Sequence, residues 1–136
     1  MNYPLMKKYW LVLLTALSLM ACERSIDSFT LRIEPVFARV TLLPKTGQVS
    51  KPIPIKIRVE EPSPCYQDMI LLLEKESAFT YRLQANAGYV NRNEVCSQAV
   101  VVTDTIFTFV PPQKGTYIIH TNKPPFPVQT DSIRVE

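Results

Sequence analysis

The chain contains few of the residues on which hydrolases and metalloenzymes depend. Its 136 residues include three glycines, three cysteines, one tryptophan and one histidine. It has no glycine-rich phosphate loop, no Gly-x-Ser-x-Gly turn and no His-Glu-x-x-His pair, which excludes the usual motifs of nucleotide hydrolases, serine hydrolases and zinc proteases. A metal site needs several ligands, and His120 is the only histidine. We therefore expect neither a metal nor another cofactor.

The chain also lacks an apolar run long enough to cross a membrane. The uncharged stretch from Tyr9 to Met20 has about a dozen residues, whereas a transmembrane helix needs roughly 20. The stretch follows two positive charges, Lys7 and Lys8, and ends at the small residue Ala21. A positive start, a short apolar run and a small residue before the cleavage site are typical of a secretory signal peptide.

The residues at the end of that stretch, Leu19-Met20-Ala21-Cys22, resemble the lipobox of bacterial lipoproteins. The resemblance implies cleavage before Cys22, a diacylglyceryl thioether on its thiol and usually an acyl chain on its amine, with palmitate as an expected acyl group. Two or more acyl chains hold a protein stably on a membrane. The expected organisation is a signal peptide at 1–21, a lipidated tether at 22–28 and one domain at 29–136.

The net positive charge is nearly zero once the signal peptide is removed. Fifteen basic residues less Lys7 and Lys8 leave thirteen, against twelve acidic residues. No basic block remains that could follow a phosphate backbone, so nucleic acid is excluded as a partner. The expected partners are the membrane, through the lipid on Cys22, and an envelope protein. Glu23 replaces the aspartate that enteric lipoproteins use for inner-membrane retention, which favours the outer membrane.

Apolar and polar residues alternate over several short segments of the expected domain. The clearest runs from Ile53 to Glu60, and its Pro54 indicates an edge strand or an amide position that points outward. Met69 to Leu73 is apolar without alternation, which is typical of a strand covered on both faces. A short helix capped by Asp68 is the alternative. Further strands are predicted at 29–34, 36–42, 79–85, 99–110, 117–121 and 128–135, with a polar loop at 88–94. The segment 99–110 is either one long strand or two that meet near Asp104.

Short strands separated by turn signals every ten or so residues predict an all-β, antiparallel sandwich of about seven to nine strands. Gly115 to Ile119, after a proline-rich turn, resembles the penultimate strand of immunoglobulin-like domains, where a tyrosine bonds to nearby backbone through its hydroxyl. Tyr117 would be that tyrosine. Antibody-type domains have a cysteine where Ile119 stands, so the resemblance is to the broader bacterial Ig-like class. It implies a fold and no binding function.

Two cysteines, Cys65 and Cys96, remain once Cys22 is assigned to the lipid. A signal peptide leads to an oxidising compartment, so we predict a disulfide between them. The loop it closes would contribute about 3 to 4 kcal/mol of stability. Two free buried thiols are the alternative.

Candidates for catalysis are few. Glu74 and Glu76 in an extended segment would lie about 7 Å apart, close to the carboxylate spacing of inverting glycosidases. Lys75 between them and the expected hairpin bend indicate a solvated turn instead. His120 falls in a predicted strand and is expected to face solvent or a satisfied core position. We therefore expect a binding, adaptor or structural module rather than an enzyme. The alternative is a small envelope enzyme or enzyme inhibitor that acts through loops.

The predicted interaction surface follows from strand direction. If each strand reverses the chain, the connections at 61–68, 87–98 and 122–127 emerge at one end, together with the two cysteines. That end would gather three aromatic candidates for binding: Tyr66, Tyr89 and Phe126. Prolines on both sides of Phe126 restrict its burial. The expected domain contains no tryptophan, which argues against carbohydrate as a ligand, although its tyrosines leave that class open.

Overall fold

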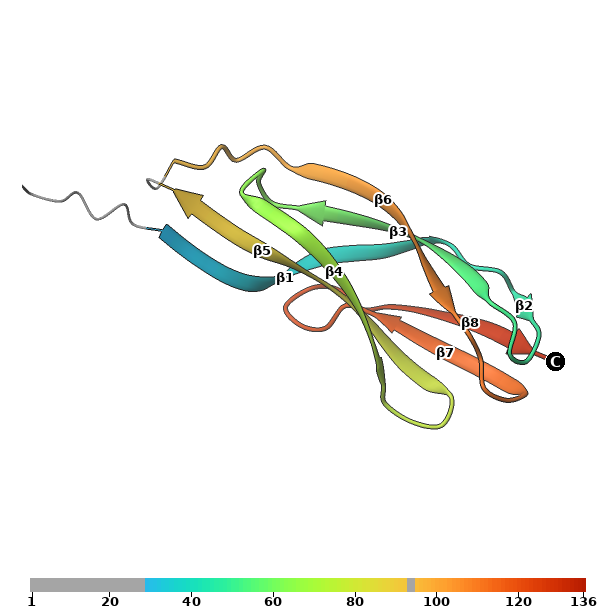
Figure 1. Ribbon diagram of the computed structural model, residues 1–136. Coiled ribbons are helices and arrows are strands. Elements are labelled where there is room, and N and C mark those ends of the chain that lie inside the picture. The colour runs from blue at the N-terminus through green and yellow to red at the C-terminus, as the bar shows by residue number, and fades with distance from the viewer. Residues whose placement is uncertain (1–28, 93–94) are drawn as a thin grey trace, which may run out of the picture.

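The computed structural model describes residues 29–92 and 95–136, and all regular elements in these ranges are strands (Figure 1). The predicted all-β class is therefore confirmed, and no helix in these ranges has the length and apolarity to cross a membrane. The strands are β1 (Phe29–Leu42), β2 (Thr46–Gly47), β3 (Ile53–Glu61), β4 (Tyr66–Lys75), β5 (Thr80–Arg92), β6 (Val101–Phe109), β7 (Gly115–Thr121) and β8 (Gln129–Val135).

Strand β1 is shared between two ladders. Its first half, from Phe29 to Val36, pairs antiparallel with β5, and its second half, from Phe37 to Leu42, pairs antiparallel with β3. The first ladder also contains β4, β7, β8 and the short β2, and the second ladder ends in β6. The long β1 therefore joins the ladders into one curled sheet.

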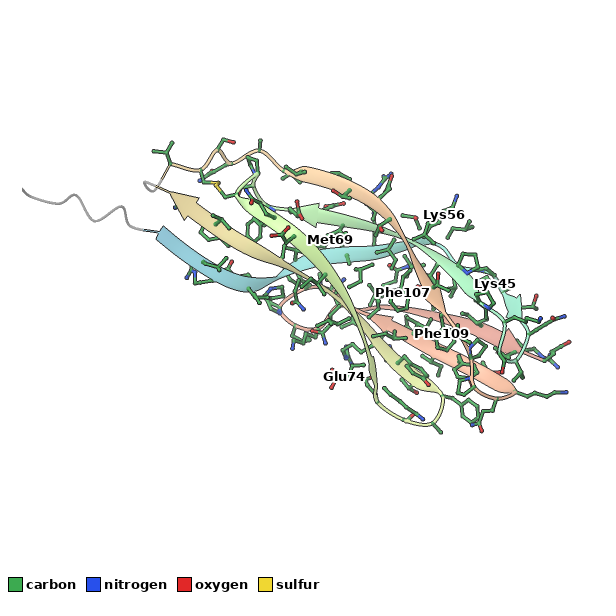
Figure 2. All side chains as sticks on the ribbon, in the orientation of Figure 1. Lys45, Lys56, Met69, Glu74, Phe107 and Phe109 are labelled. Carbon is green, nitrogen blue, oxygen red and sulfur yellow. A yellow bond between two sulfur atoms is a disulfide. The ribbon has the colours of Figure 1, made fainter. Side chains whose placement is uncertain are left out.

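The two ladders close over a common core. Phe109 lies on β6 (Figure 2), and the centre of its ring is 5.3 Å from the ring centres of Tyr81 on β5 and Tyr117 on β7. In the hydrogen-bonded order β3 and β1 separate β6 from β5, and β7 lies one strand further away. Such contacts require the sheet to fold back on itself. The buried apolar residues are Val36, Ala38, Ile53, Ile55, Ile57, Val59, Tyr81, Leu83, Ala85, Ala87, Phe109, Tyr117, Ile119, Ile133 and Val135.

The prediction that all strands pair antiparallel is wrong, because the sheet is mixed. Thr80 to Leu83 of β5 pair in parallel with Ile118 to Thr121 of β7, and β2 pairs in parallel with β8. The cause lies in the path of the chain between β5 and β7. It crosses to the other ladder to form β6 and then returns, so β7 runs in the same direction as β5 and lies beside it.

The predicted bond of the Tyr117 hydroxyl to nearby backbone is present. Tyr117 is fully buried, and its hydroxyl donates a hydrogen bond of 2.8 Å to the carbonyl of Gln113, four residues upstream. This bond fixes the turn that leads into β7. It also gives the one polar atom of a large core side chain a partner, which removes the cost of burying that atom.

The predicted strand at 29–34 forms, but its apolar face is not the dry one. Leu31 and Ile33 are 61% and 73% exposed. The buried positions Val36 and Ala38 lie on the opposite face of the same uninterrupted strand. Pro35 marks the point where the apolar residues change face, and the strand continues through it because its pairing changes there from β5 to β3.

Strand β4 contains Met69 to Leu73, the segment for which the sequence allowed either a strand or a short helix. The segment is a strand, but Ile70 and Leu72 are about half exposed, so it is covered on one face only.

Pro54 lies inside the second ladder rather than at its edge. The β1–β3 pairing stops at Lys56, so the amide that Pro54 lacks would have had no partner on β1.

Strand β5 also continues through the predicted loop at 88–94, as far as Arg92. Its second half is paired on both edges, with β1 on one side and β4 on the other. Gly88 lies in this segment, and a Cβ atom there would be 3.4 Å from the carbonyl oxygen of Gln67, an ordinary van der Waals distance. Pairing on two edges therefore holds a polar, glycine-containing segment in an extended conformation.

Candidate functional site

The candidate site lies at the end of the molecule where the Cys65–Cys96 disulfide joins the β3–β4 connection to the β5–β6 connection. The predicted disulfide is present, with 6.1 Å between the two Cα atoms. Its neighbourhood is tied further by the Ser63 hydroxyl, 3.1 Å from Cys96 Sγ, and by the Val90 amide, which donates to the Cys65 carbonyl at 2.8 Å. We call this region the disulfide end.

Two of the three predicted binding residues meet at the disulfide end. Tyr66, the first residue of β4, pairs directly with Tyr89 of β5. Their rings are tilted and their centroids lie 5.2 Å apart, a favourable arrangement for two aromatic rings. Cross-strand pairing therefore gives the aromatic pair a fixed geometry.

Polar residues surround the tyrosine pair, and the sequence did not identify them as part of a site. Glu34 accepts a hydrogen bond of 2.7 Å from the Tyr66 hydroxyl and lies 3.3 Å from the guanidinium of Arg32. The Arg32 guanidinium carbon lies 5.5 Å from the centre of the Tyr89 ring, within range of a cation–π interaction. The side-chain amide of Asn91 donates to the Tyr89 hydroxyl at 3.2 Å.

The change of face at Pro35 explains why Arg32 and Glu34 were not predicted as site residues. Arg32 and Glu34 were expected on the wet face of β1 because Leu31 and Ile33 alternate with them. In the structure they occupy the face that carries Val36 and Ala38 further along the strand. A signal was present in the sequence, because the apolar residues occupy odd positions before Pro35 and even positions after it.

Burial controls the protonation of two groups near this end. It raises the pKa of the Tyr66 phenol to about 12, and the hydrogen bond to the Glu34 carboxylate adds to the rise. Tyr66 therefore keeps its proton at neutral pH and remains a donor. Burial also raises the pKa of Glu61, the last residue of β3. Asn91 Oδ1 is buried and has no hydrogen-bond partner among the described residues.

Phe126, the third predicted binding residue, lies elsewhere. Its ring is 6.1 Å from that of Phe37, and the side chain is half-buried beside Val36 and Ala85. Strand β7 ends at Thr121, which pairs with Leu83, and the following loop emerges there. Tyr89 is six residues further along β5, a distance of about 20 Å at the rise of a strand. The three connections therefore do not form one surface.

The three candidate catalytic residues, His120, Glu74 and Glu76, do not form a catalytic arrangement. His120 lies on β7, with its Nδ1 atom 3.0 Å from the hydroxyl of Thr130 on β8. Glu76 lies in the β4–β5 turn, where it forms an ion pair with Arg82, and Glu74 is exposed at the end of β4 (Figure 2). Within residues 29–92 and 95–136, no group of three His, Cys, Asp or Glu side chains is placed to hold a metal ion.

No protein-family model, curated protein or solved structure matches this chain. The chemistry of the disulfide end is therefore the main guide to its role. It brings together two half-buried tyrosine rings, a guanidinium, a carboxylate and a side-chain amide, which are groups capable of stacking and hydrogen bonding. Lipidation of Cys22 concerns a residue outside the described ranges.

Proposed function

We propose that the chain is a lipid-anchored lipoprotein of the bacterial cell envelope whose domain acts as a binding or adaptor module. The observation that carries the proposal is the Leu19-Met20-Ala21-Cys22 stretch, preceded by Lys7, Lys8 and a short uncharged run. A lipid on Cys22 holds the domain close to the membrane, because the six residues from Glu23 to Ser28 span at most about 20 Å.

The proposed site of partner binding is the disulfide end, with Tyr66 and Tyr89 as its aromatic residues. Two arguments support this assignment. Loops and strand ends held by a rigid scaffold are where proteins commonly place recognition residues. The Tyr66–Tyr89 pair is also held by a disulfide and by paired strands, so little conformational entropy is lost when a partner binds. The proposed partner is an envelope protein.

We further propose that the domain is a variant of the Ig-like sandwich. The hydroxyl of Tyr117 bonds to the backbone of Gln113, as in the tyrosine corner of that fold. Strand β1 divides its pairing between two ladders. The parallel pairing of β5 with β7 is the departure that makes it a variant.

The anchoring proposal is tested with Cys22→Ser in the full chain. The wild-type protein should remain in the membrane pellet after a high-salt wash, and mass spectrometry should find the lipid on Cys22. The serine variant should leave the pellet and still form the Cys65–Cys96 disulfide, because the lipid and the core are independent. A serine variant that stayed in the pellet would contradict the proposal.

Glu23→Asp provides the matched control for location. If the resemblance to enteric lipoproteins applies, this variant remains lipidated but moves from the outer to the inner membrane fraction. Unchanged fractionation of Glu23→Asp would remove the argument for the outer membrane and leave the argument for lipidation intact.

A further inference from the structure

Strand β6 forms a long free edge of the sheet. It lies at the end of the strand order, and no other described strand pairs with its second side. Its pairing with β3 is continuous from Val101 to Phe109 without a bulge, and β6 itself contains no proline. Its single charged residue, Asp104, forms a bidentate ion pair with Arg58, with both contacts at 2.7 Å.

The direction of the backbone groups can be traced across the second ladder, beginning at β1. The amide and carbonyl of Ala38 both bond to the side chain of Asn122, and those of Val40 both bond to the side chain of Gln129. The backbone amides and carbonyls of Ala38 and Val40 therefore point away from β3. The residue between them, Arg39, points toward β3, because successive residues of a strand direct their backbone groups to opposite sides.

The same alternation continues through β3 to β6. Arg39 pairs with Arg58, so the backbone amide and carbonyl of Arg58 point toward β1. Those of its neighbour Ile57 point toward β6. Ile57 pairs with Thr105, which therefore points back toward β3. The residues of β6 that alternate with Thr105 direct their amides and carbonyls to the free edge: Val102, Asp104, Ile106 and Thr108.

The other long edge strand, β4, is protected in ways that β6 is not. Its pairing with β5 shifts register between Gln67 and Ile70, and Asp68 there has a positive φ of 52°. Its last two residues, Glu74 and Lys75, carry charge. Bulges and charged residues are the devices by which proteins prevent edge strands from pairing with other chains.

We propose that β6 pairs antiparallel with β6 of a second copy of this chain and so forms a two-fold symmetric dimer. A second copy is the occupant because the outward residues are self-complementary. Pairing centred on Ile106 places the two Ile106 side chains opposite each other and each Asp104 opposite a Thr108, which can donate to it. Pairing centred on Asp104 would oppose two carboxylates and is disfavoured.

The side chains on the outer face agree with this arrangement. Val102 and Ile106 are 53% and 60% exposed, and pairing would cover part of both. Ile106 is flanked within its own chain by Lys56, its pairing partner on β3, which is exposed (Figure 2). Neither the lipid anchor nor the disulfide end takes part in this pairing.

The test is sedimentation of the full chain in density-matched detergent, with Ile106→Glu as the disrupting variant. The glutamate would face Lys56 in its own chain, so the monomer should tolerate it. Across the dimer, in the register centred on Ile106, it would oppose the same glutamate of the second copy. We expect a dimer for the wild-type chain and a dissociation constant at least about tenfold higher for the variant.

Ile33→Glu is the matched control, because Ile33 has the same residue type and is also exposed, but lies on β1. It should leave the dimer unchanged. A wild-type chain that is monomeric up to about 500 µM contradicts the proposal. Loss of the dimer in Ile33→Glu with retention in Ile106→Glu would assign the interface to the outer face of β1 and β4 instead.

Ile106→Cys keeps the proposal testable if the glutamate variant does not fold. In the register centred on Ile106 the two introduced thiols face each other within disulfide range, and a cross-linked dimer should appear on a non-reducing gel. Thr103→Cys should not cross-link, since that register places the two Thr103 residues on opposite sides of the centre. Equal cross-linking at both positions would indicate non-specific contact and contradict the pairing.

Discussion

The middle and the disulfide end of the molecule use the same strands for different purposes. In the middle, inward-facing residues of β5 such as Leu83 and Ala85 are fully buried among aliphatic and aromatic side chains. Four and six residues after Ala85, the same face of β5 carries Tyr89 and Asn91. Tyr89 packs against Tyr66 and accepts a hydrogen bond from Asn91. The alternation of the strand continues while the chemistry of its inner face changes.

This difference shows that two kinds of interaction hold the two regions. Burial of apolar surface stabilises the middle, where Tyr117 lies at the centre of the aromatic contacts. Cross-strand pairs, hydrogen bonds and a covalent link hold the disulfide end, where exposure is greater. Substitutions in the middle should therefore unfold the domain, whereas those at the disulfide end should leave the fold intact.

The largest effect is expected from Tyr117→Ala. The substitution removes a fully buried ring and both hydrogen bonds to Gln113, and should lower the free energy of unfolding by about 4 to 5 kcal/mol. Tyr117→Phe retains the ring and should cost about 1 to 2 kcal/mol. Urea unfolding followed by circular dichroism measures both. A loss below about 2 kcal/mol for the alanine variant would contradict the central role of Tyr117.

Removal of the disulfide should have the next largest effect. The paired substitution of Cys65→Ala and Cys96→Ala opens a loop with a sequence separation of 31 and should lower stability by about 3 to 4 kcal/mol. The far-ultraviolet circular dichroism spectrum of the folded state should not change, because the core lies in the middle of the molecule. Labelling of the native protein with a thiol reagent provides the check: modification of both cysteines without prior reduction would refute the disulfide.

A smaller, pH-dependent effect is expected from Tyr66→Phe. Loss of the hydrogen bond to Glu34 should cost about 1 kcal/mol at neutral pH. Because folding raises the pKa of Tyr66 from about 10 to about 12, the folded state holds its proton more tightly than the unfolded state. The stability advantage of the wild-type chain over the variant should therefore be full below pH 10 and decrease between about pH 10 and 12. A difference that is constant across this range would contradict the buried, hydrogen-bonded phenol.

The sequence predicted the middle of the molecule better than its ends. Alternation identified β3 and its buried face. The strands β3, β5 and β7 run in the same direction, as the prediction from strand direction requires, although the connections that follow them do not meet. These features depend on local periodicity and on the path of the chain, both of which can be read from sequence. The disulfide was also predictable, because two cysteines in an oxidising compartment have few alternatives.

The composition of the site depended on strand lengths that no local pattern specifies. Strand β5 extends to Arg92 because it is paired on both edges, whereas β7 stops at Thr121. Parallel strands of unequal length end at different levels, so Phe126 lies beside Phe37 rather than beside Tyr89. Arg32 and Glu34 were missed for a different reason. The shift of the apolar residues from odd to even positions at Pro35 was interpreted as an interruption between two strands, whereas it marks a change of face within one strand.

The claim that the disulfide end meets an envelope partner can be tested most directly by photo-crosslinking in native membranes. A benzophenone amino acid would replace Tyr89 in the full chain, and Ile118, on the outer face of β7, would be replaced in a control chain. We predict a specific adduct from position 89 and none from position 118. The absence of an adduct at position 89, or equal adducts at the two positions, would contradict the assignment of the disulfide end as the recognition site.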